Sequence, residues 1–189
     1  MSPFEYISAF QAIVLGLATA NVLTALASTI KSRSEISIFW VHTGWCLYSL
    51  FAYVALWFGM WEVLQQSSSI TIFQFMLFFQ WAIFLYVGSQ LLRPDDFSKI
   101  DLEEYFFKIK TPFLICWAIP SIVGLVWLQT ISWEPFSMVA MSRYALIGVT
   151  LIGVFTNSRR SQEMVFVLVV ILQLIQEALQ PGLVIGSGA

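Results

Sequence analysis

Apolar residues run along this chain in six long segments that are separated by short polar gaps. Each segment is close in length to the roughly 20 apolar residues that an α-helix needs to cross about 30 Å of hydrocarbon. The pattern predicts an all-α, polytopic transmembrane helical bundle with about six spans, formed by residues 1–189 as a single domain. We place the spans at about 6–29, 38–63, 70–92, 111–130, 136–155 and 164–179.

The composition supports a membrane protein. Hydrophobic residues make up 59% of the chain and charged residues 11%, which leaves too little polar surface to cover a water-soluble globule of this size. The lipid bilayer is therefore the predicted solvent and partner, and no nucleic-acid binding is expected. The N-terminus lacks the basic region and the cleavage site of a signal peptide, so we expect the first apolar segment to be retained as a helix.

Basic residues occupy alternate gaps. Eight of the nine cations lie in three gaps, while the gaps at 65–69 and 129–133 have none. The eight are Lys31, Arg33, Arg93, Lys99, Lys108, Lys110, Arg159 and Arg160. By the positive-inside rule, the three basic gaps face the cytoplasm. Six spans then place both termini on the other side, which in a bacterial inner membrane is the periplasm.

Small residues recur every four positions along the first span, at Ser8, Ala12, Gly16, Ala20, Thr24 and Ser28. This spacing suits a close right-handed crossing with a neighbouring helix, so we expect the first helix to be central in the bundle.

An amphipathic segment follows the third span. Asp101 and Glu104 resemble a capping box, Glu104 is positioned to pair with Lys108, and apolar residues recur at helical spacing. The pattern predicts a short helix that lies in the membrane interface between spans three and four and ends before Pro112.

The candidate site combines a polar stripe on the sixth helix with one arginine on the fifth. The stripe covers an arc of about 100°, which is costly in lipid and so must face protein or water. Arg143 lies about 12 Å deep by helical rise, and we expect it to reach Glu177, with Glu62 and Glu134 as alternative partners. The predicted site residues are Arg143, Glu177, Gln173, Gln176, Gln180 and Glu62.

Two interpretations of this site remain open. Arg143 could line an outward-facing cavity that attracts a small ion or anionic solute, or it could form a dry ion pair that fixes helix register. The leading hypothesis is a small-solute or ion transporter or channel. The alternative is a non-transporting membrane subunit or sensor that binds a partner protein or lipid. Assembly as a homo-oligomer is compatible with both hypotheses.

Other polar residues in the spans have two explanations as well. Amides of the first and third spans can hydrogen-bond across helices or line a pore; they are Gln11, Asn21, Gln74, Gln80 and Gln90. We expect His42 to form interfacial hydrogen bonds, with a proton relay as the alternative. Cys46 and Cys116 are predicted to be buried core thiols.

Enzyme signatures are absent from the sequence. There is no Gly-x-Ser-x-Gly, no His-Glu-x-x-His, no phosphate-binding glycine loop and no aspartate within a predicted span. A single histidine argues against a histidine-built metal or haem site. We therefore predict that the protein is not an enzyme and holds no cofactor or metal.

Short motifs in the first two thirds of the chain resemble a known family. They are Phe4-Glu5-Tyr6, Leu15-Gly16-Leu17, Thr24, Trp40-Val41-His42, Trp45, Trp57, Leu92-Arg93-Pro94-Asp95, Asp101-Leu102 and Tyr105-Phe106. Together they resemble an uncharacterised family of small bacterial polytopic integral membrane proteins. The resemblance covers residues 4–113 and implies a bacterial inner-membrane location, with no catalytic or binding residue carried over.

Overall fold

Six helices account for most of the chain in a computed structural model that describes residues 3–65, 71–131 and 136–179. They are α1 (Pro3–Lys31), α2 (Trp40–Gln65), α3 (Ile72–Leu91), α4 (Leu102–Ile131), α5 (Met138–Phe155) and α6 (Arg159–Leu179). Five of these helices, within the described residues, are long and apolar enough to cross a membrane, whereas the apolar part of α3 is shorter, Phe75–Leu91. The predicted all-helical membrane bundle is confirmed.

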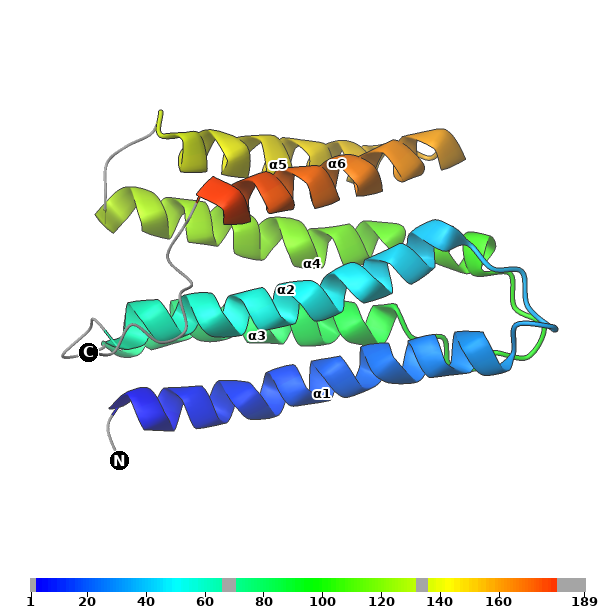
Figure 1. The fold of residues 1–189 in the computed structure, drawn as a ribbon, viewed down its shortest axis with the longest axis horizontal. Helices are drawn as coiled ribbons and strands as arrows, with labels where there is room; N and C mark the ends of the chain where they lie inside the picture. The colour runs from blue at the N-terminus through cyan, green and yellow to red at the C-terminus, as the bar shows by residue number, and fades with distance from the viewer. Residues whose placement is uncertain (1–2, 66–70, 132–135, 180–189) are drawn as a thin grey trace.

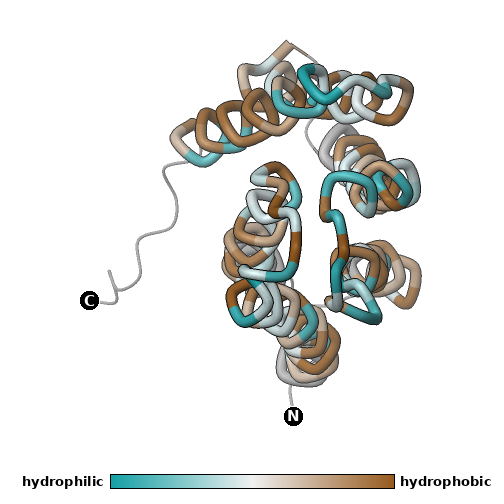
Figure 2. The backbone as a smooth tube through the Cα atoms, turned by 90° about the vertical axis from the view of Figure 1, so that its right-hand side faces the viewer, coloured by the Kyte–Doolittle hydropathy of each residue, from teal (hydrophilic) through white to brown (hydrophobic). Residues whose placement is uncertain are grey.

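The helices lie side by side along one long axis (Figure 1). Helix α3 packs between α1 and α4, α5 packs against α4 and α6, and α2 contacts α1 and α6. Figure 2 looks along this axis at the end that carries the interhelical connections, and it shows teal, hydrophilic residues there and brown, hydrophobic residues on the helical coils. The α1–α2, α3–α4 and α5–α6 connections share one end of the bundle, and α1 begins and α6 ends at the opposite end.

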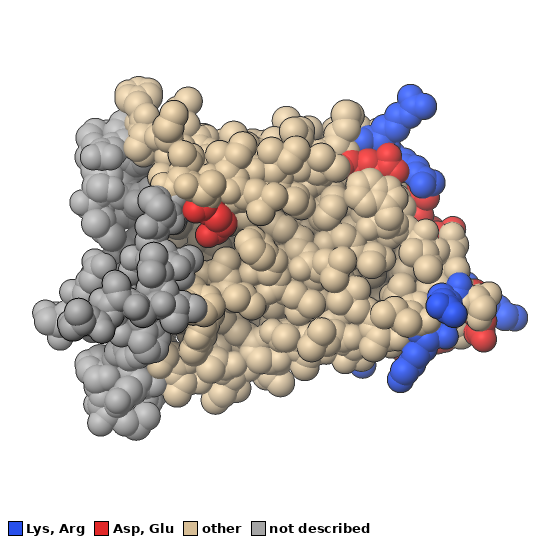
Figure 3. Space-filling model, viewed as in Figure 1, with Lys and Arg blue, Asp and Glu red and all other residues tan. Residues whose placement is uncertain are grey.

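Charged side chains gather at the end that carries these three connections, which we call the charged end (Figure 3). The exposed cations there are Lys31, Arg33, Arg93, Lys99, Lys108, Arg159 and Arg160. Acidic side chains lie among them, and most of the bundle between its ends is uncharged on the face shown. The predicted grouping of the basic gaps on one side is therefore present in the fold.

Two connections at the charged end are joined to each other through their backbones. The Ser37 amide donates to the carbonyl of Ile100 at 3.2 Å, and the Leu102 amide donates to the carbonyl of Ser37 at 3.0 Å. Asp101 caps α4 by accepting a hydrogen bond from the Glu103 amide at 2.8 Å. The two backbone hydrogen bonds of Ser37 fix how the α1–α2 pair meets the α3–α4 pair.

The predicted interfacial helix is helical but not separate. It is the first part of α4, which continues through Pro112 and Pro120. The predicted Glu104–Lys108 ion pair is present at 3.0 Å. However, Leu102 and Phe106 are fully buried, with the Phe106 ring 5.7 Å from the Phe39 ring. The apolar face of this segment is therefore covered by protein, and neighbouring helices support the helix where proline removes a donor.

The first helix was expected to be central, with its small-residue stripe at a close helix crossing, but α1 contacts only α2 and α3 among the described helices and most of the stripe is exposed. Ala12, Gly16, Ala20 and Thr24 are exposed, and a Cβ added at Gly16 would meet no atom within 4 Å. The buried face of α1 instead carries residues spaced by three and four: Ile7, Gln11, Leu15, Ala18, Val22, Ala25 and Thr29. This buried face mixes large apolar, small and polar side chains, so small size alone does not mark the face of α1 that meets its neighbours.

Aromatic rings fill the junction of α2, α4 and α6. Trp45 lies at its centre, with ring centroids 5.1 Å from Phe113 and 5.4 Å from Phe166. Gly44 permits this approach, because a Cβ there would lie 2.6 Å from the tip of the Phe166 ring. The Phe166 ring is itself held edge-on to Trp40 at 5.6 Å.

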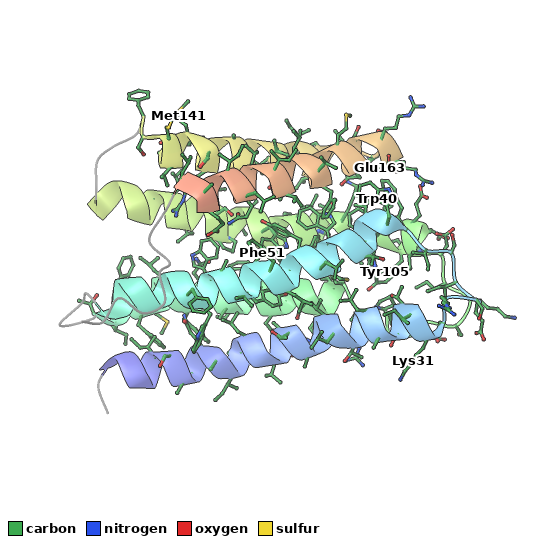
Figure 4. All side chains as sticks on the ribbon, viewed as in Figure 1. Lys31, Trp40, Phe51, Tyr105, Met141 and Glu163 are labelled. Atoms are coloured by element: carbon green, nitrogen blue, oxygen red, sulfur yellow. The ribbon has the colours of Figure 1, made fainter. Side chains whose placement is uncertain are left out.

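A second set of contacts joins these elements at the charged end. Trp40 on α2 and Glu163 on α6 lie next to each other there (Figure 4), and the Trp40 indole donates to Glu163 at 3.1 Å. Arg159 donates to both Glu163, at 3.1 Å, and Glu103 of α4, at 2.9 Å. These exposed pairs set the spacing of α2, α4 and α6 at this end.

Two buried polar side chains close the C-terminal end of α5. The Lys110 ammonium is 3.0 Å from the carbonyl of Val154 and 3.5 Å from that of Gly153, and the residue is only 3% exposed. The Gln162 amide donates at 2.8 Å to the carbonyls of Gly153 and Thr156. A cation at the negative end of a helix dipole is stabilising. These contacts fix the register of α5, the helix that carries Arg143.

Replacing Gly44 with alanine should destabilise the bundle. The added methyl group would force the Phe166 ring away from Trp40 and Trp45, and overpacking of this kind costs about 1–3 kcal/mol. Thermal unfolding in detergent measures the effect, with Gly148→Ala as the matched control because a Cβ at Gly148 meets nothing within 4 Å. Equal stability of the two variants would contradict the close α2–α6 contact.

Replacing Lys110 with methionine should cost more stability than replacing Lys108 with methionine. The first change leaves the part-buried carbonyl of Val154 without its side-chain donor, and leaving such a polar group unpaired costs about 1–3 kcal/mol. Lys108 is exposed, and among the described residues its ion pair is with Glu104, so its loss should change the free energy of unfolding by about 0.5 kcal/mol or less. Chemical unfolding in detergent micelles compares the two.

Candidate functional site

A chain of hydrogen bonds links α6 to α2 within the membrane-spanning part of the bundle. Gln173 and Glu177 are one turn apart on α6, and the Gln173 amide donates to the Glu177 carboxylate at 2.7 Å. The side-chain oxygen Oε1 of Gln173 in turn accepts a hydrogen bond from the Tyr48 hydroxyl of α2 at 3.4 Å. Tyr48 is buried. Glu177 is thus hydrogen-bonded to Gln173, which is itself hydrogen-bonded to Tyr48 on the neighbouring helix α2.

Arg143 lies on α5, which packs against α6. The expected close pair is absent: no Arg143–Glu177 ion pair within 4 Å is among the salt bridges of the described residues. Glu177 accepts instead from Gln173 on its own helix. The Nε atom of Arg143 is buried and has no hydrogen-bond partner among the described residues, although the residue as a whole is half-buried.

Of the predicted site residues, Gln173 and Glu177 are joined by a hydrogen bond, and Arg143 lies on the adjacent helix α5. Gln176 is half-buried on α6, and no hydrogen bond of its side chain is recorded in the described part of the chain. The Glu62 side chain, Glu134 and Gln180 lie outside the described residues. An acidic side chain is visible well away from the charged end, among uncharged residues, on the face shown in Figure 3.

Sequence analysis missed Tyr48. Its ring packs among the aromatic residues of the core, 5.4 Å from Trp45 and 5.1 Å from Trp117, so a search for charged and amide side chains overlooks its hydroxyl. A buried tyrosine hydroxyl needs a partner, and this requirement is the signal that points to a polar contact in the second span.

The amides of α1 and α3 include both helix-to-helix contacts and unpaired groups. The Asn21 amide donates to Ser89 across the α1–α3 interface at 3.1 Å, as expected of a residue that joins helices. Gln90 donates to Tyr86 on its own helix. The amide atoms of Gln11 and Gln80 are buried without partners. The Gln74 side chain lies outside the described residues.

His42 is fully buried near the charged end. Its Nε2 atom lies 2.9 Å from the carbonyl of Leu92, just past the end of α3. A carbonyl can only accept, so Nε2 carries the proton in this contact. The prediction of a hydrogen-bonding histidine is thus confirmed, although His42 lies inside the protein and its Nδ1 atom has no partner.

Cys46 and Cys116 are both buried and free, as predicted. Within the described residues, no cluster of three or more histidine, cysteine, aspartate or glutamate side chains is arranged to hold a metal ion.

Comparison with known protein families, curated proteins and solved structures finds no match for this chain. The site geometry therefore carries the functional argument. That geometry is a half-buried arginine on α5 whose Nε atom has no partner among the described residues, and, on the adjacent helix α6, a carboxylate that accepts from a glutamine of its own helix.

A shallow groove lies between α1 and α2, apart from this site. It has a volume of about 370 Å³ and is lined by Ala12, Leu15, Gly16, Thr19, Tyr53, Val54, Trp57 and Phe58. The lining is almost entirely apolar, and two members of the small-residue stripe of α1 form part of it.

Proposed function

We propose that the protein is a small-solute or ion transporter or channel, with Arg143, Gln173 and Glu177 on its pathway. The observation that supports this is the state of Arg143: its Nε atom is buried and unpaired, and its guanidinium forms no ion pair within the described residues. A charge inside a span is costly, and such residues mark solute pathways and proton relays. An arginine kept only for helix register would be fully paired.

The same proposal includes location and orientation. Cations gather at one end of the bundle, which supports a cytoplasmic charged end by the positive-inside rule. Since α1 begins and α6 ends at the opposite end, both termini would face the periplasm of a bacterial inner membrane. The resemblance of residues 4–113 to bacterial membrane proteins favours the same compartment. No catalytic role is proposed.

A second candidate is a membrane subunit that binds a partner protein or another copy of this chain. The exposed small-residue face of α1 favours it, because small residues let helix backbones approach closely in lipid. The two candidates use different surfaces of the protein, α5 and α6 in one case and α1 in the other.

Replacing Arg143 with glutamine should abolish solute flux or change which ion is transported. Purified protein in liposomes is tested for flux of protons, alkali cations and small anions, and removal of the guanidinium should lower flux of the transported ion by about tenfold or more, equivalent to 1.4 kcal/mol. Arg160→Gln is the matched control, because Arg160 is exposed at the charged end. Flux that is equal in both variants would remove Arg143 from the pathway, and no wild-type flux for any ion would argue against the transport proposal.

Replacing Gly16 with leucine separates the second candidate from the first. If α1 is an interface, the added side chain should reduce association of differently labelled copies, or of chain and partner, as measured by energy transfer in liposomes. Gly148→Leu on α5 is the control, since both glycines face open space. Identical energy transfer in wild type and both variants would exclude self-association through this face.

A further inference from the structure

Lys110 places a cation inside a membrane-spanning helix without a carboxylate partner. The residue is 3% exposed and follows Leu102, the first residue of α4, by eight positions, which is about 12 Å along the helix axis. No ion pair of the described residues includes Lys110. A buried charge is costly unless it is paired or hydrogen-bonded, so uncharged groups must stabilise this ammonium.

Backbone oxygens at the end of α5 supply that stabilisation. The Nζ atom of Lys110 is 3.0 Å from the carbonyl oxygen of Val154 and 3.5 Å from that of Gly153, and both residues belong to the last turn of α5. Carbonyls of a last helical turn lack an amide donor in their own helix and form the negative end of the helix dipole. They therefore attract a positive charge and accept its hydrogen bonds.

Gln162 joins this group of oxygens from the first turn of α6. It is fully buried, and its amide nitrogen donates at 2.8 Å both to the carbonyl of Gly153 and to that of Thr156. Lys110 and Gln162 thus contact the same oxygen atom of Gly153. Because the nitrogen of the amide faces the carbonyls, its oxygen Oε1 is left buried without a donor. The group offers acceptors only, and one of them is unused.

We propose that these oxygens form a binding site for a monovalent cation of the alkylammonium type, and that Lys110 occupies it as a ligand tethered to α4. An ammonium group carries three N–H donors and no acceptor, which matches a group made of acceptors. An alkali cation requires several oxygens in place of its hydration shell, and Nζ has two within reach. The inference goes beyond the transport function proposed above and does not depend on it.

The tether makes binding of the cation and packing of α4 against α5 a single event. Replacing Lys110 with alanine separates the two, because it removes three methylene groups and the ammonium but leaves the acceptors of α5 and α6 in place. The truncated side chain has the length of n-propylammonium. A free ion of this shape should therefore bind the variant.

Thermal unfolding of full-length Lys110→Ala in detergent, with n-propylammonium chloride added, tests the site. The salt should raise the unfolding temperature of the variant by about 2–4 °C in a saturable manner. Wild type and Lys108→Ala are the matched controls, because Lys108 is an exposed lysine of the same helix, and neither should gain this increase. Three other additives are compared at equal concentration: propan-1-ol, tetramethylammonium chloride and potassium chloride.

Each additive removes one feature of the proposed ligand. An equal effect of propan-1-ol would show that positive charge is not required, and an equal effect of tetramethylammonium or potassium would show that N–H donors are not required; either result would overturn the assignment. No effect of any additive on a folded variant would overturn it as well.

A measurement on the wild type decides the matter if Lys110→Ala does not fold. In protein labelled with nitrogen-15 at lysine Nζ, Lys110 should give an ammonium signal at neutral pH whose hydrogens exchange slowly with water, whereas those of Lys108 exchange fast. A neutral amine at Lys110, or exchange as fast as at Lys108, would contradict a cation bound by buried carbonyls.

Discussion

Hydrocarbon neither donates nor accepts hydrogen bonds, so each polar group within the spans must find its partner inside the protein. The bundle meets this requirement in two ways. Serine and threonine hydroxyls return to the backbone of their own helices, as Thr19, Ser49 and Thr150 do. Other polar side chains cross between helices, as Asn21 and Tyr48 do. The second group gives the helices their specific neighbours, since apolar contact alone does not distinguish a helix from a lipid tail.

Exceptions to this rule are the informative positions. In the described part of the chain, buried polar atoms without a partner remain on Gln11, His42, Thr43, Trp45, Gln80, Arg143 and Gln162. Each leaves hydrogen-bonding capacity unused at a cost in free energy, and of these seven residues Arg143 alone carries a permanent charge. A charged group with an unpaired donor costs more than a neutral one, and this cost is why Arg143 is the residue on which the proposed pathway is built.

The fold was largely predictable from hydropathy because each span is long and the polar gaps are short. The sequence also predicted the shared location of the basic gaps, which is visible at the charged end. The face that each helix buries was harder to predict. Small residues on α1 and the amphipathic start of α4 could each face either lipid or a protein neighbour. For α4, the packing of Phe39 on Phe106 shows a protein neighbour. For α1, the open space around Gly16 shows that this face is not covered by another helix of the chain.

The candidate site was predictable in part. A polar arc on α6 and an arginine in α5 are conspicuous in an apolar background, and the structure packs α5 against α6 and joins Gln173 to Glu177. Their pairing was not predictable, because depth counted along two helices cannot show whether Gln173 or Arg143 reaches the carboxylate first. Lys110 shows the same limit: it appears at the edge of a polar gap, yet its side chain turns into the bundle toward α5.

That buried lysine also links the order of synthesis to the final structure. Lys110 lies on α4, while the carbonyls that accept from it belong to residues 153 and 154, more than forty positions later in the chain. These two contacts can therefore form only after α5 has been synthesised and packed against α4, so the final environment of the start of α4 depends on a helix that follows it in the chain.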